Sequence, residues 1–162
     1  MKKILVIGCP GSGKSIFSRA LQQRTGLPLH HLDLLYWNPD KTHLTHETFL
    51  AKLSSILAED HWIIDGNYKR SLDLRLQHCN AVIFLDYSLE SCLEGIASRK
   101  GKARPDMPWI EDENDYAELR AFVQSFHRSE RQAVIDLLKS YPGIHLITFY
   151  NHEEAACYLE TL

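Results

Sequence analysis

The sequence predicts a three-layer α/β fold, in which helices cover both faces of a five-stranded parallel sheet. Three observations favour it: five short apolar segments, amphipathic helical patterns between them, and a glycine-rich loop that directly follows the first segment. Strands that alternate with helices form parallel sheets, because each helix carries the chain back to the edge where it began. The five segments cover residues 4–7, 27–32, 62–64, 81–85 and 144–149.

Capping residues and apolar periodicity predict the helices of the first half. The helix after the glycine-rich loop should end near Gly26, which suits a left-handed cap, and Pro28 prevents its continuation. A second helix should begin after Thr45, because apolar residues then recur on one helical face. Short helical material is expected at residues 71–78, before the fourth strand.

The second half begins with Ser88, a good N-cap for an amphipathic helix. This helix should break up in residues 99–108, where glycine, proline and charged residues predict a mobile loop. A long helix is expected from about residue 113 to residue 140, followed by a Pro-Gly turn and the last strand. Asn151 should cap the final helix.

Composition narrows the class of protein. The 162 residues are 44% hydrophobic and 24% charged, which is typical of one globular domain covering residues 1–162. The first apolar segment is too short for a signal peptide, and no apolar run approaches membrane-spanning length, so we expect a cytoplasmic protein. A net charge of −3 gives no overall attraction to nucleic acid.

The cysteines and histidines give only weak metal-binding signals. Because the cysteines lie far apart and lack C-x-x-C spacing, we expect reduced thiols rather than a disulfide frame or a zinc knuckle. Adjacent residues on a strand face opposite sides, so His30 and His31 cannot both point into one site, and each is expected to be structural. The cysteines are Cys9, Cys79, Cys92 and Cys157.

The strongest functional signal is "GCPGSGKS", residues 8–15, which fits the P-loop pattern G-x-x-x-x-G-K-[ST] between a strand and a helix. Glycines let successive backbone N–H groups turn inward and form an anion nest at the positive end of the helix. Lys14 should reach the β- and γ-phosphates of a nucleotide, and the Ser15 hydroxyl should bind Mg²⁺. The alternative, a tight glycine turn, does not need Lys and Ser at these positions. The expected nucleotide-binding residues are Gly8, Gly11, Ser12, Gly13, Lys14 and Ser15.

Carboxylates follow three of the predicted strands, at the sheet edge where ligands bind in such folds. Asp65 precedes Gly66 and is either part of the site or a residue that starts a turn. Asp86 is expected to be a structural carboxylate. Asp33 could accept the proton of an acceptor hydroxyl as it attacks a γ-phosphate, or it could belong to a charged turn whose aromatic residues cover the core edge.

The residues after Asp33 give the predicted acceptor site. Tyr36, Trp37 and Asn38 should line it together with Asp33, within an acceptor-side segment at about 34–60. Basic residues gather in a lid-like segment at about 99–112, where Arg99 and Arg104 could close onto the transferred phosphate and exclude water. A solvated basic stretch is the alternative for this segment.

Four motifs together resemble the adenylate-kinase-like bacterial proteins often labelled DNA topology modulation proteins: "GCPGSGKS", "HLDLLYWNP", "IIDGNYKRSLDLRL" and "ARPDMP". The resemblance covers almost the whole chain and implies a P-loop NTPase fold with strand order 2-3-1-4-5. It also implies that Asp65 orients water on Mg²⁺, and that Lys69 or Arg70 lies near an acceptor phosphate.

We therefore expect an ATP-dependent, Mg²⁺-requiring kinase of a small hydroxylated or phosphorylated molecule. One alternative is a nucleotide-binding regulatory protein that affects DNA topology, with slow or no phosphotransfer; another is a nucleotide binder that has lost its chemistry. The acidic balance and the absence of a helix-turn-helix signal favour the kinase. The expected catalytic residues are Lys14, Asp33, Asp65, Arg99 and Arg104.

Overall fold

Five parallel strands form the centre of the computed structural model, which describes residues 1–162. The strand order is β2-β3-β1-β4-β5, and every neighbouring pair is parallel, which confirms the predicted α/β fold and order. The strands are β1 (Lys3–Gly8), β2 (Leu29–His31), β3 (Trp62–Asp65), β4 (Ala81–Leu85) and β5 (His145–Phe149).

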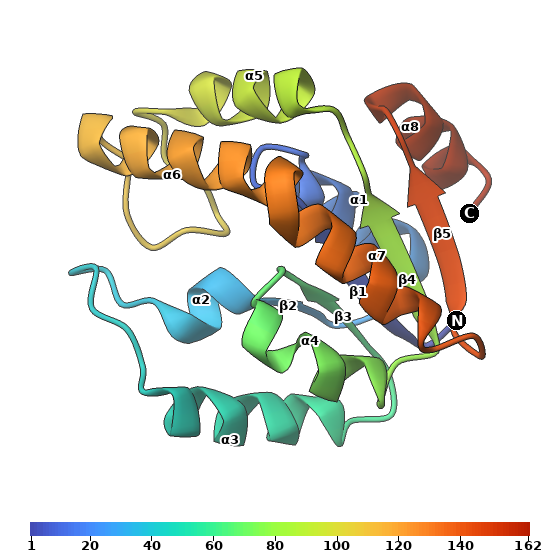
Figure 1. Ribbon diagram of the computed structural model, residues 1–162. Coiled ribbons are helices and arrows are strands. Elements are labelled where there is room, and N and C mark those ends of the chain that lie inside the picture. The colour runs from blue at the N-terminus through green and yellow to red at the C-terminus, as the bar shows by residue number, and fades with distance from the viewer.

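Helices cover both faces of this sheet. In Figure 1, α4 and α7 lie in front of the strands and α1 lies behind them, so the chain forms three layers. None of the helices combines the length and the apolar character needed to cross a membrane. The helices are α1 (Lys14–Thr25), α2 (Leu32–Tyr36), α3 (His46–Leu57), α4 (Lys69–Leu76), α5 (Leu89–Arg99), α6 (Glu113–Ser125), η1 (Phe126–Glu130), α7 (Arg131–Lys139) and α8 (His152–Glu160).

The predicted caps are confirmed. Gly26 ends α1 in the left-handed conformation, with φ of 71°. The side chains of Thr45, Ser88 and Asn151 each accept a hydrogen bond from a backbone N–H in the first turn of α3, α5 and α8. Local capping chemistry therefore fixes where several of these helices begin.

Most boundaries lie within a residue of the prediction, but two larger differences bear on the site. β2 ends at His31, because its pairing with β3 stops where Asp65 meets Gly66, and Leu32 instead begins the short helix α2. Asp33 therefore lies in the first turn of a helix rather than in a turn after a strand. α4 begins at Lys69, two residues before the predicted start.

The predicted long helix is continuous from α6 to α7 but contains a five-residue π-helical turn, η1. A π-helical turn is wider than an α-helical turn and rotates the side chains that follow it. The sequence pattern did not predict this turn. It brings His127 against the glycine-rich loop, as described below.

The core surrounds the central strands. Every residue of β3 and β4 is buried, whereas β5 at the edge buries only Phe149. Because the central strands are covered on both faces, their ends are held rigidly, and the polar groups at their carboxyl ends are placed by the core. This edge of the sheet carries the candidate site.

Candidate functional site

A cavity of about 1360 Å³ lies beyond the carboxyl ends of the strands. Its walls are the glycine-rich loop (residues 8–15), the end of β3, the lid segment (residues 99–112) and α6. Most of the predicted site residues meet there. Those that line the cavity are Gly11, Gly13, Lys14, Ser15, Asp33, Trp37, Asp65, Lys69, Arg99 and Arg104.

The other predicted residues lie outside this cavity. Ser12 is fully buried, and Gly8 lies at the end of β1. Tyr36 and Arg70 line a separate, smaller cavity. Asn38 lines neither of the two cavities and donates a hydrogen bond of 2.9 Å to the Thr42 hydroxyl.

The glycine-rich loop needs its glycines for two reasons. Gly11 and Gly13 have φ of 84° and 83°, in the left-handed region that side chains disfavour. A Cβ on Gly11 would also lie 2.1 Å from the Cys92 carbonyl oxygen, so the loop packs directly on α5. The Gly8 N–H donates to the Asn67 side chain at 2.9 Å, which ties the loop to the segment after β3. No side chain caps the start of α1, so its first N–H groups remain available to a ligand.

Lys14 and Ser15 extend from this loop into the cavity. The Lys14 ammonium donates to the Cys9 carbonyl at 3.1 Å, and the Ser15 hydroxyl donates to Asp65 Oδ2 at 2.8 Å. Burial lowers the pKa of Lys14, although the nearby Asp65 carboxylate opposes this shift. The Asp65 carboxylate therefore offsets only part of the cost of burying the positive charge of Lys14.

Asp65 accepts a second hydrogen-bonding contact from a histidine. His31 Nδ1 lies 2.6 Å from the same Oδ2, which leaves Oδ1 without a protein partner, and the residue is only 4% exposed. His30 points elsewhere and contacts Glu59 at 3.5 Å, so the expectation that the two histidines face opposite sides is confirmed. The sequence did not place His31 in the site; its register opposite Asp65 in the sheet does.

Asp33 is held by a tyrosine. The Tyr68 hydroxyl donates to Asp33 Oδ1 at 2.5 Å. Burial raises the pKa of the Asp33 carboxyl, and the Tyr68 hydrogen bond opposes part of that shift. Tyr68 has φ of 37°, an unusual value for a side-chain-bearing residue. The fully buried Arg75 supports this conformation, because its guanidinium donates to the carbonyls of Gly66, Asn67 and Tyr68.

The lid segment brings its arginines into the cavity already paired. Arg99 contacts Glu111 at 3.1 Å, and Arg104 contacts Asp106 at 3.1 Å and Glu111 at 3.3 Å. Arg19 of α1 reaches Asp106 at 3.4 Å. The two carboxylates are only 3% and 5% exposed, so the alternative of a solvated stretch is wrong for these arginines. Although burial opposes it, the Arg104 guanidinium holds the pKa of Asp106 below its usual value.

The sequence did not identify Asp106, Glu111 or Arg19 as site residues. The lid segment has no helical or strand period after Arg99, so no pattern indicates which of its side chains turn inward. The only available signal was charge: three acidic residues, Asp106, Glu111 and Asp112, stand within a segment that also carries the basic residues.

The side of the cavity away from the glycine-rich loop is closed by contacts among half-buried and exposed residues. The rings of Trp37 and Trp109 meet edge to face with centroids 5.4 Å apart. Lys41 donates to Asp115 at 2.9 Å and to Asp112 at 3.4 Å, and it lies over the Trp109 ring. We call this region the lid end of the cavity, and the region around the glycine-rich loop and the end of β3 the loop end.

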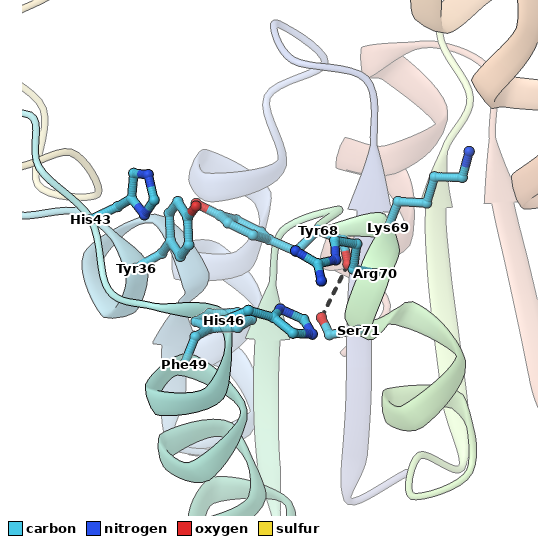
Figure 2. A pocket seen from close by; sticks show the side chains of 8 residues that line it. All are labelled: Tyr36, His43, His46, Phe49, Tyr68, Lys69, Arg70 and Ser71. Carbon is cyan, nitrogen blue, oxygen red and sulfur yellow. Dashed lines mark hydrogen bonds between the residues drawn. The ribbon is translucent and has the colours of Figure 1, made fainter.

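A second cavity of about 280 Å³ lies on the other side of Tyr68. Tyr68 contacts Tyr36 and Phe49, with ring centroids 5.3 and 5.4 Å apart, so its ring forms a wall between the two cavities. Figure 2 shows Lys69 pointing away from this group, and its ammonium contacts Glu130 at 3.0 Å. Lys69 and Arg70, adjacent in sequence, therefore extend in different directions.

Comparison with known proteins gives no identification. No protein-family model matches the chain, and neither does any curated protein. The residues of the site therefore have to define its chemistry. They offer free helix N–H groups and the half-buried Lys14 to an anion, with two carboxylates nearby and two arginines in the lid segment.

Proposed function

We propose that the protein is a Mg-ATP-dependent phosphotransferase that transfers the γ-phosphoryl group of ATP to a small-molecule acceptor. The observation that carries this proposal is that one cavity contains Lys14 with the uncapped start of α1, the carboxylates of Asp65 and Asp33, and the lid residues Arg99 and Arg104. Phosphoryl transfer needs these kinds of group: cations and N–H donors on the phosphates, metal ligands, and a base for the nucleophile. The four motifs that resemble adenylate-kinase-like proteins support the same reading.

The loop end suits the phosphates of the nucleotide. The first N–H groups of α1 have no side-chain partner, and the partial positive charge of the helix favours an anion there. The Lys14 ammonium donates one hydrogen bond, to the Cys9 carbonyl, and on nucleotide binding it donates to a charged phosphate oxygen instead. Because burial disfavours the free ammonium, an anion at this position is stabilised more than at an exposed lysine.

Ser15 and Asp65 suit a hard cation. Their oxygen atoms are 2.8 Å apart at the edge of the cavity, and hydroxyl and carboxylate oxygens are ligands that Mg²⁺ accepts. Mg²⁺ bound there supplies positive charge to the phosphate oxygens. His31 fixes the orientation of the Asp65 carboxylate through its contact with Oδ2.

Asp33 is the base of the proposal. Its Oδ1 accepts from Tyr68, so Oδ2 is the atom that takes the proton of the acceptor hydroxyl. A carboxylate whose pKa is raised by burial binds that proton more strongly than an exposed one. Arg99 and Arg104 are held in the cavity by Glu111 and Asp106, and they donate to the equatorial oxygens of the transferred group.

The proposal is tested by screening acceptors for ADP release. Panels of sugars, hydroxy acids, nucleosides and nucleoside monophosphates are added to the protein with Mg-ATP. We expect one class to stimulate ADP release, and Asp33→Asn to lose about 100-fold or more of that rate while calorimetry shows nearly unchanged Mg-ATP binding. Asp60→Asn is the matched control, because Asp60 is exposed and makes no hydrogen bond or ion pair.

Two results would contradict the proposal. One is Mg-ATP binding without stimulated turnover for any acceptor class. The other is tight DNA binding that weakens steeply with salt, which would favour the regulatory alternative.

A further inference from the structure

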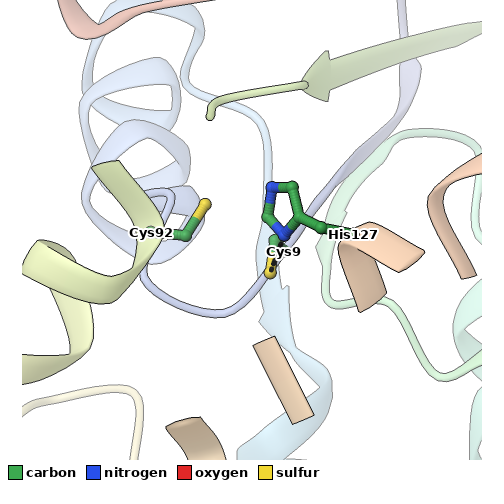
Figure 3. A group of neighbouring side chains, drawn as sticks. All are labelled: Cys9, Cys92 and His127. Carbon is green, nitrogen blue, oxygen red and sulfur yellow. Dashed lines mark hydrogen bonds between the residues drawn. The ribbon is translucent and has the colours of Figure 1, made fainter. Parts of the chain in front are cut away.

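Three side chains with soft or borderline metal-ligand atoms meet beneath the glycine-rich loop. Cys9 belongs to that loop, Cys92 to α5 and His127 to the π-helical turn η1, so the three come from distant parts of the chain (Figure 3). Their ligand atoms all lie within 4.8 Å of one another, and Cys9 Sγ is 3.9 Å from His127 Nδ1. The proposed phosphotransfer uses none of these side chains.

The spacing is close to what a tetrahedral zinc-type centre needs. Zinc–sulfur and zinc–nitrogen bond lengths imply sulfur–sulfur and sulfur–nitrogen separations of roughly 3.8 and 3.6 Å. The present separations reach these values after movements of about 1 Å or less. Two thiols and one imidazole form a ligand set that zinc uses, with the fourth position open to water.

The surroundings of His127 point to a ligand as well. Nε2 lies 3.0 Å from the Tyr87 carbonyl oxygen and Nδ1 lies 3.0 Å from the Val123 carbonyl oxygen. A neutral imidazole carries one N–H, so it can donate to only one of these carbonyls. If Nε2 donates to Tyr87, the Nδ1 lone pair has the Cys9 thiol at 3.9 Å as its only protein donor, and a cation bound between the two sulfurs would be a stronger partner. Metal-bound histidines commonly donate the N–H of their second ring nitrogen to a carbonyl, as Nε2 would donate to Tyr87 here.

The two cysteines of the cluster are also buried. Cys9 is 1% exposed and Cys92 is 0% exposed. The π-helical turn widens the helix at His127, and such turns occur often at functional sites. Gly11 packs against the backbone of Cys92, which fixes the distance between the loop and α5.

We propose that Cys9, Cys92 and His127 bind one soft divalent cation of the zinc class and thereby tie the glycine-rich loop to α5 and η1. On binding, each thiol loses its proton and forms a sulfur–metal bond, while Nδ1 donates its lone pair. One cation therefore enters and two protons leave, with no change of oxidation state. The site is distinct from the hard-cation position at Ser15 and Asp65, because its ligands are sulfur and nitrogen rather than oxygen.

The first test uses the intact protein, reduced and stripped of metal, with Cd²⁺ as the probe. We expect the ultraviolet thiolate-to-cadmium absorption to rise until about one equivalent is bound, and about two protons to be released per cation. Saturation should raise Tm by roughly 5 °C, because the cation binds only the folded protein. The ¹¹³Cd resonance of the unmodified protein should indicate two thiolate ligands, a readout that requires no mutation.

Variants locate the site. Cys92→Ser should weaken Cd²⁺ and Zn²⁺ binding by about 100-fold, and His127→Gln by about tenfold or more. Cys157→Ser is the matched control, because Cys157 is exposed and lies on α8, away from this cluster. Circular dichroism checks that each variant folds.

Any of three results would overturn the proposal. The first is the absence of cation uptake by the reduced protein. The second is uptake that persists undiminished in Cys92→Ser. The third is a cadmium resonance typical of a single thiolate.

Discussion

The loop end and the lid end of the main cavity are built in different ways. At the loop end, Asp65 ends a fully buried strand, and its partners come from the neighbouring strand and from the first turn of α1. At the lid end, Trp37 and Lys41 contact Trp109 and Asp112 of the lid segment, so these contacts join two irregular segments. One end therefore depends on the hydrophobic core, and the other on surface contacts.

This difference predicts which end moves. Groups at the ends of buried central strands are held by close packing, which has few alternative arrangements. The Lys41 ion pairs are largely exposed, and exposed ion pairs contribute little and weaken with salt. We therefore expect the loop end to be preorganised and the lid end to open and close around ligands.

The largest expected effect comes from breaking the loop end. Lys14→Ala removes the half-buried ammonium that the cavity offers to phosphate, so Mg-ATP affinity should fall by about 100-fold, or ~2.7 kcal/mol. Titration calorimetry measures this affinity. Lys52→Ala, on the exposed side of α3, is the control and should bind like the parent. Parent-like binding by Lys14→Ala would mean that residues 8–15 are a structural turn.

The next effect separates binding from catalysis. Arg99→Ala and Arg104→Ala should lower turnover by about 30-fold but change Mg-ATP affinity less than about threefold, because their phosphate contacts form mainly in the transition state. Steady-state kinetics and calorimetry give the two quantities. Arg120→Ala, an exposed change on α6, serves as the control. Equal losses in turnover and affinity would instead place these arginines on the bound nucleotide.

A smaller effect tests the mobility of the lid end. Trp109→Ala removes the ring that contacts Trp37 and Lys41, and losing an aromatic pair costs roughly 1 kcal/mol. Amide hydrogen exchange in the lid segment should become about fivefold to tenfold faster, while exchange in β1 stays unchanged. Ile110→Ala, at a neighbouring exposed position, should have little effect. Faster exchange throughout β1 would show that the two ends are not independent.

The smallest expected effect concerns the stability and pH dependence of Asp33. Burial raises the pKa of its carboxyl in the folded protein above the unfolded value of about 3.9. Below that value the carboxyl is protonated in both states. As pH rises above it, only the unfolded chain ionises, so the folded state loses stability until the pH has passed the folded pKa. Asp33→Asn should therefore be more stable than the parent by about 1 kcal/mol at about pH 7, and equally stable at about pH 3.

Denaturant unfolding at the two pH values measures this difference. Asp60→Asn, at an exposed position, should show no pH-dependent gain. If Asp33→Asn were less stable than the parent at neutral pH, the carboxylate would stabilise the fold through its hydrogen bond with Tyr68. It would then not be a functional group that lowers the stability of the folded protein.

The sequence predicted the loop end of the site better than the lid segment. The glycine-rich loop, Lys14, Ser15 and Asp65 were expected there because a motif and a strand end fix their positions locally. In the lid segment, Arg99 and Arg104 were expected in the cavity, but their partners Asp106 and Glu111 were not. An irregular segment has no period, so its inward side chains depend on contacts with distant residues.

Two further features could not be predicted for the same reason. Tyr36 and Trp37 are neighbours in sequence but line different cavities, because the ring of Tyr68 forms the wall between the two cavities. The cluster of Cys9, Cys92 and His127 has no spacing signature, since its members are brought together by strand order and by one π-helical turn.

The sequence by itself determined the α/β fold, the order of its elements, most helix ends and the conformation of the glycine-rich loop. These follow from constraints that act within a few residues: apolar periodicity, capping hydrogen bonds and the left-handed backbone that glycine permits. Only the tertiary structure decided that His31 faces Asp65, that Tyr68 holds Asp33, and that buried carboxylates accompany the lid arginines. Each of these contacts joins side chains through sheet register or loop packing, which the whole folded core sets and no local pattern encodes.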